Sequence, residues 1–121
     1  MTRAFISAAV ACSILIAGCG APRCPTSLAE LRSEEFQASV DPDTVAAVGT
    51  VGRFVDSPDA EFRGYDVGID VRVIGLGGNV AVYLVVVQDP VGGVEPGDQV
   101  VVVGQEGEGN SIMPTCLEPV E

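Results

Sequence analysis

Hydrophobic residues recur with a period of two along much of the chain after position 45, which is the period of a β-strand with one buried face. The segment 66–76 is the clearest case, because its apolar residues alternate with polar residues or glycine. The apolar face consists of Val67, Ile69, Val71 and Val73, and the other face of Asp66, Gly68, Asp70 and Arg72. This pattern predicts a half-buried strand.

Four further segments predict strands, at 45–55, 80–88, 99–104 and 111–120. The segment 80–88 is apolar on both faces, so we expect both sides to be covered. Stretches rich in Gly, Pro and Asp separate the strands, and Pro114 and Pro119 restrict the last strand to a sheet edge or a bulge. Five short strands with glycine bends predict a small, mainly β domain, either a closed barrel or a sandwich.

A single short helix is predicted over 25–37, before the strands. Ser27 is a favourable N-cap, and Glu30 stands three positions later, as in a capping box. Leu28, Leu31 and Phe36 would form an apolar edge. We expect this helix to lie on the domain and to end before Asp41-Pro42-Asp43.

The first residues have the organisation of an export signal. Arg3 precedes an uncharged, largely apolar run at 4–17, which is too short for a membrane span of about 20 residues. The sequence Ile16-Ala17-Gly18-Cys19 then resembles the lipobox of bacterial lipoproteins. The resemblance implies cleavage between Gly18 and Cys19 and a diacylglyceryl group on the Cys19 sulfur. An ordinary secretory leader cut elsewhere is the alternative.

Two cysteines remain once Cys12 leaves with the leader and Cys19 carries lipid. In an exported chain this even remainder indicates a disulfide between Cys24 and Cys116. A redox pair, a metal pair and free thiols are the alternatives. The first two lack support, because the chain has no CxxC motif and no histidine.

The region 45–120 resembles the OB-fold. The turn and strand in VEPGDQVVVVGQ are similar to the fourth strand of that family, and VGTVGRFV is similar to its first. The resemblance implies a five-stranded, OB-like closed barrel. The helix that often joins strands three and four is missing, since 89–98 is rich in Gly and Pro. An SH3-like barrel and a β-sandwich therefore remain alternatives.

Composition narrows the function. The net charge is −11, from 17 acidic residues and six basic residues, all of them arginine. Binding of single-stranded nucleic acid needs a basic groove with stacking aromatic residues, so we expect no nucleic-acid partner. The chain offers no histidine base and no GxSxG motif, and we expect no enzymatic activity and no catalytic residues.

Carboxylates gather in one predicted loop and at the strand that follows it. The positions are Asp56, Asp59, Glu61 and Asp66. Oxygen ligands suit Ca²⁺, so a weak Ca²⁺ site is one interpretation, although the spacing matches no EF-hand loop. The other interpretation is a solvated acidic loop that keeps the domain soluble and requires no cofactor.

These features predict a signal peptide at 1–18, a lipidated tether at 19–27, a short helix at 28–37 and a β-domain at 45–120. We expect a lipid-anchored cell-envelope protein that faces away from the cytoplasm and acts as a non-enzymatic binding or scaffold module. Its partner would be another envelope protein or a small ligand. The alternative function is a small-ligand or Ca²⁺ sensor that uses the acidic loop at 56–66.

Overall fold

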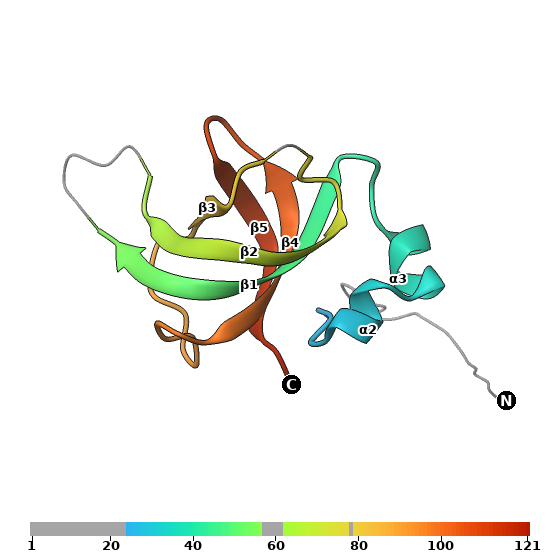
Figure 1. The fold of residues 1–121 in the computed structure, drawn as a ribbon, viewed down its shortest axis with the longest axis horizontal. Coiled ribbons are helices and arrows are strands. Elements are labelled where there is room, and N and C mark those ends of the chain that lie inside the picture. The colour runs from blue at the N-terminus through green and yellow to red at the C-terminus, as the bar shows by residue number, and fades with distance from the viewer. Residues whose placement is uncertain (1–23, 57–61, 78) are drawn as a thin grey trace, which may run out of the picture.

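Five β-strands form a sheet that closes in a ring, and two short helices precede it (Figure 1). The structure is a computed structural model that describes residues 24–56, 62–77 and 79–121. The helices are α2 (Leu28–Leu31) and α3 (Glu34–Ser39). The strands are β1 (Thr44–Val55), β2 (Gly64–Ile74), β3 (Val82–Val86), β4 (Gln99–Glu106) and β5 (Ser111–Pro119). The mainly β prediction is confirmed, and all five strands overlap the predicted segments.

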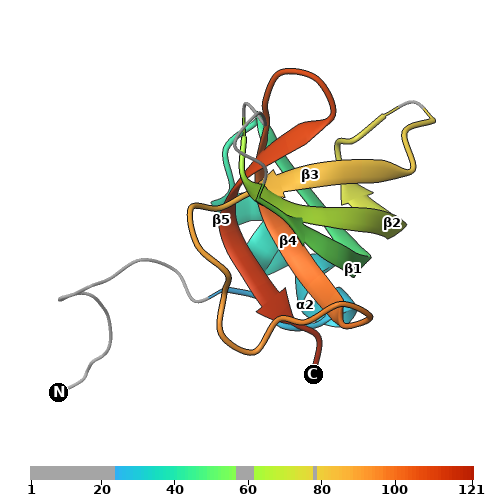
Figure 2. The same cartoon turned by 90° about the vertical axis from the view of Figure 1, so that its left-hand side faces the viewer.

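The strand order around the ring is β1-β2-β3-β5-β4, and antiparallel pairing of β1 with β4 closes it. Among the strands of the described residues, β3 and β5 alone are parallel, and they pair at two positions, Leu84–Ser111 and Val85–Ile112 (Figure 2). The connection at 89–98 holds turns and no helix, as its Gly and Pro content predicts. The five strands thus close in a ring, and the resemblance to the OB-fold stays a prediction from sequence.

The strand β1 pairs with β2 along one edge and with β4 along the other. Its pairing with β2 shifts register between Val48 and Gly49. A Cβ atom at Gly49 would lie 2.6 Å from the main-chain oxygen of Gly68, so only glycine allows the two strands to approach so closely. Pro114 in β5 stands beside a similar register shift opposite Gly104, which confirms that this strand accommodates its proline at a bulge.

Two apolar clusters stabilise the domain. The first fills the ring and includes Tyr65, Val67, Tyr83, Val85 and Val102, each with 2% or less of its surface exposed. The second lies outside the ring, between the wall of β1 and β4 and the two helices. Its buried members are Leu31, Ala46, Val48, Val101 and Val103. The run of valines in β4 is therefore explained by burial on both faces, since alternate residues enter different clusters.

The predicted single helix is two helices. Ser27 caps α2, and its side chain accepts a hydrogen bond from the Glu30 amide at 3.1 Å. Ser33 then caps α3 in the same way, accepting from the Phe36 amide at 3.2 Å. A second serine that competes for main-chain hydrogen bonds ends the first helix after one turn. The Glu30 carboxylate accepts from the Thr26 amide at 2.7 Å, one residue before the position expected of a capping box.

Two expectations about strand faces were wrong in part. In β2, Val67 and Ile69 contact the inner cluster, whereas Val71 and Val73 contact the outer one. The reason is a bulge in β2: Ile69 pairs with Gly49 and Val71 with Val48, so Asp70 is an extra residue that switches the alternation of faces. In β3, Val82 is 50% exposed, whereas Leu84 and Val86 on the same face are partly buried, so this face is covered only in part.

A candidate binding groove beside the disulfide

The N-terminal segment is held to the last strand at its first described residue. The sulfur atoms of Cys24 and Cys116 are 2.11 Å apart, and their Cα atoms 5.7 Å, so the predicted pair lies at disulfide distance. The Glu121 amide donates to the main-chain oxygen of Thr26 at 2.9 Å, which ties the same segment to the C-terminus. From residue 24 onward, the predicted tether is therefore part of the folded domain. The predicted cleavage and lipidation positions, Gly18 and Cys19, lie outside the described residues.

The four predicted Ca²⁺ ligands are not assembled in the described part of the chain. Asp56 forms an ion pair with Arg63 at 3.0 Å, and Asp66 one with Arg53 at 3.5 Å. Asp59 and Glu61 fall in 57–61, outside the described residues. Within 24–56, 62–77 and 79–121, no group of three or more acidic, Cys or His side chains is placed to hold a metal ion. The Ca²⁺ site remains a prediction from sequence.

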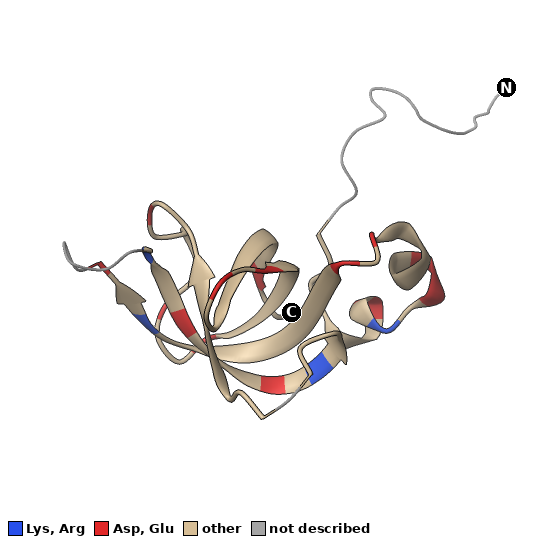
Figure 3. Ribbon diagram, turned by 90° about the horizontal axis from the view of Figure 1, so that it is seen from above, with Lys and Arg blue, Asp and Glu red and all other residues tan. Residues whose placement is uncertain are grey.

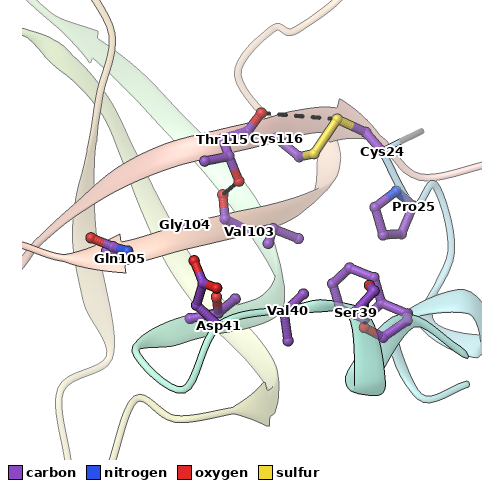
Figure 4. Close-up of a pocket in the computed structure, with 12 residues that line it drawn as sticks. Cys24, Pro25, Ser39, Val40, Asp41, Val103, Gly104, Gln105, Thr115 and Cys116 are labelled. Atoms are coloured by element: carbon purple, nitrogen blue, oxygen red, sulfur yellow. Dashed lines mark hydrogen bonds between the residues drawn. A yellow bond between two sulfur atoms is a disulfide. The ribbon is translucent and has the colours of Figure 1, made fainter. Parts of the chain in front are cut away.

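A groove lies between the helical segment and the outer wall of the barrel, next to the disulfide (Figure 4). Its volume is about 460 Å³, within the range of small-molecule and side-chain pockets. Cys24, Pro25 and Phe36 line the helical side, and Val103, Gly104 and Cys116 line the barrel side. The connection that carries Val40 and Asp41 lies across the hollow from β4.

Leu31 anchors the helical segment on the outer wall of the barrel. Leu31 has no exposed surface and packs in the outer cluster, with Leu28 and Phe36 beside it. Phe36 is only partly buried, so part of its ring remains available in the groove. A Cβ atom at Gly104 would collide with the main-chain oxygen of Met113, so the absence of a side chain lets β5 approach β4 at this end of the groove.

Polar groups surround the apolar floor of the groove. Ser39, Asp41, Thr44, Gln105 and Thr115 complete the lining. Thr115 is already engaged, because its hydroxyl donates to the main-chain oxygen of Val103 at 3.2 Å. Acidic residues recur along α3 and the connection to β1 (Figure 3), and the groove therefore lies in a negative part of the surface. An apolar floor with a polar, acidic margin can bind a ligand that is apolar and cationic.

Sequence reasoning identified the disulfide and the apolar edge of the helical segment but not the groove between them. The available signal was Pro25 beside Cys24, together with the apolar edge of Leu28, Leu31 and Phe36. These residues alone do not reveal a groove, because its other side is formed by Val103 on the outer face of β4.

Among the described residues, no helix has the length and hydrophobicity of a membrane span. Comparison with known proteins finds no matching family model, no matching curated protein and no matching solved structure.

Proposed function

We propose that this protein is a lipid-anchored component of the cell envelope and acts as a non-enzymatic binding or scaffold module. The observation that carries the proposal is the link between Cys24 and Cys116. It holds residue 24 against the barrel, only five residues after the predicted lipid-bearing Cys19. Five residues of extended chain reach at most about 18 Å. A lipidated Cys19 would thus keep the disulfide end of the barrel, and the groove beside it, close to the membrane surface.

The charge of the protein favours attachment through the acyl chains over adsorption of the domain to the membrane surface. The net charge of −11 opposes contact with anionic lipid headgroups. Attachment would therefore depend on the acyl chains, of which two are needed for stable anchoring. The short tether would keep the barrel near the membrane, and electrostatic repulsion would prevent the barrel from lying flat on the membrane surface.

A binding role fits the chemistry of the chain better than a catalytic one. The sequence contains no histidine to serve as a base near neutral pH. Two of the carboxylates nominated as ligands, Asp56 and Asp66, are in ion pairs with arginine. The groove offers apolar surface, hydroxyl groups and an amide, which suit recognition of a partner.

The anchor is tested by the mass of the protein isolated from bacterial membranes without reduction. We expect residues 19–121 plus a diacylglyceryl group, with or without a third acyl chain, less two hydrogens for the disulfide. A Cys19→Ser variant should leave the membrane fraction. An unlipidated mass, or one that retains residues 1–18, contradicts the anchor.

The binding role is tested separately by photo-crosslinking in intact cells. A photoreactive residue placed at Gln105, in the groove, should give one discrete adduct in the envelope. The matched control is the same residue at Gln88, which is exposed and outside the groove. No adduct from position 105, or the same adducts from both positions, contradicts a binding role for this groove.

A further inference from the structure

The groove beside the disulfide continues into a hollow at each end, so that three hollows follow the helical segment and its connection to β1. The hollow at the α2–α3 end has a volume of about 460 Å³ and shares Pro25, Phe36 and Ser39 with the groove. The hollow at the other end has a volume of about 450 Å³ and shares Thr44 and Gln105. Because neighbouring hollows share these residues, the three adjoin one another, and we refer to them together as the depression.

The middle of this depression is apolar. Phe36 lines two of the three hollows, and it faces the groove together with Pro25 and Val103. Val103 belongs to the buried outer cluster and Phe36 packs against it, so this part of the floor is preorganised. One or two apolar side chains of a partner would bury their surface here.

Both ends of the depression are acidic. Its lining includes five carboxylates: Glu30, Glu35, Asp41, Asp43 and Glu106. Among the described residues, no arginine lines any of the three hollows. The described arginines Arg53 and Arg63 pair with acids elsewhere, and Arg72 donates to the main-chain oxygens of Leu76 and Val80. Arg32 stands between α2 and α3, and Glu30 accepts hydrogen bonds from Thr26. Carboxylates therefore outnumber arginines on this face, and the exposed ones include Glu35, Asp43 and Glu106.

We propose that this depression binds an extended, basic segment of a partner protein, in which arginine or lysine residues flank one or two apolar residues. The inference rests on the proposed binding function and names its partner class. The three adjoining hollows favour a polypeptide over a small cation. The acidic margin repels the phosphate of lipid headgroups and also a second copy of this chain, whose net charge is −11.

The test uses the full protein as isolated from membranes, in a neutral detergent, and the labelled peptide Arg-Arg-Leu-Val-Arg-Arg as the probe. Fluorescence anisotropy measures its dissociation constant at low and at physiological salt. We expect saturable binding that weakens as salt is added, because screening reduces the attraction. The peptides Glu-Glu-Leu-Val-Glu-Glu and Arg-Arg-Ser-Ser-Arg-Arg serve as controls for charge and for the apolar pair. Each should bind at least about tenfold more weakly.

Matched triple variants separate the groove from the overall charge. The groove variant carries Glu35→Gln, Asp43→Asn and Glu106→Gln. The remote variant carries Asp89→Asn, Glu95→Gln and Glu108→Gln, which also removes three exposed carboxylates. We expect the groove variant to weaken binding roughly tenfold, at about two- to threefold for each exposed charge, and the remote variant less than about twofold.

Each outcome decides the proposal. Equal losses in the two variants mean nonspecific attraction and overturn it, as does tight binding of the Ser-Ser peptide. No binding of the basic peptide, or a dimer formed through this face, also overturns it. If the peptide fails while the photoreactive residue at position 105 still gives its adduct, the partner class is wrong but the binding function stands. If both fail, the binding function is also contradicted.

Discussion

Removing the link between Cys24 and Cys116 should lower the stability of the whole domain, not only that of the helical segment. The two residues are 92 positions apart, so the bond closes nearly all of the chain from Cys24 onward into one loop. In the unfolded state, an intact bond denies the chain most of its open conformations. The double variant Cys24→Ala, Cys116→Ala removes this restriction without leaving a free thiol in the domain.

The expected magnitude follows from the loop length. For a loop of 92 residues, the chain-entropy relation gives a loss of about 4.6 kcal/mol in the free energy of unfolding at 25 °C. A domain of this size loses about 4 °C or more in melting temperature for each kcal/mol. The double variant should therefore melt about 20 °C below the disulfide-bonded protein.

The assay compares urea and thermal unfolding of residues 19–121 with Cys19→Ser, with and without the double substitution. Far-UV circular dichroism reports the strands, and fluorescence reports Tyr65 and Tyr83 in the inner cluster. The two probes should change together in both proteins. A loss below about 1 kcal/mol with a single transition would refute the reasoning. It would mean that the closed loop contributes little to the stability of the domain.

Three other substitutions test the packing. Leu31→Ala should lower the free energy of unfolding in urea by about 2–4 kcal/mol, because removal of a fully buried leucine side chain leaves a cavity under the helices. A loss below about 1 kcal/mol would mean that Leu31 does not anchor the helices on the barrel. Gly104→Ala should lower the free energy of unfolding by more than about 2 kcal/mol, because the new Cβ atom would collide with the main chain of β5. Gly92→Ala is the control: its Cβ atom would meet nothing within 4 Å, and stability should change by less than about 0.5 kcal/mol. Equal melting temperatures of these two variants would contradict the close approach of β4 and β5. Tyr65→Phe should lower the free energy of unfolding by about 1–2 kcal/mol, because the tyrosine oxygen accepts a hydrogen bond from the Val91 amide at 2.8 Å. An unchanged unfolding midpoint would show that water takes the place of the tyrosine oxygen as the acceptor.

Local patterns were enough to predict the strands and turns. Alternation of apolar residues located β2, and glycine and proline located the bends, because both signals arise from the conformations of a few neighbouring residues. The helical segment was predicted less well. Ser27 was recognised as a cap, but Ser33 can either continue a helix or cap a new one, and its neighbours do not decide between the two.

Burial on a given face depended on contacts between distant segments. Val71 and Val73 continue the pattern of Val67 and Ile69, yet they contact a different cluster, because Asp70 is an extra residue in the pairing of β2 with β1 and switches the faces beyond it. Val82 stands in an equally apolar stretch, yet half of its surface is exposed. A strand's own residues cannot report which of its faces another segment will cover.

The sequence alone determined the class of the fold, the strand segments and the single pairing available to the two remaining cysteines, since periodicity, turn chemistry and cysteine number are local or countable properties. The lipid anchor at Cys19 stays a prediction from sequence. The tertiary structure decided that two helices cover the outer wall of β1 and β4, and that Phe36 and Val103 face each other across a groove with acidic ends. A groove forms between segments that lie about 60 residues apart in the chain, so it exists only once the ring has closed.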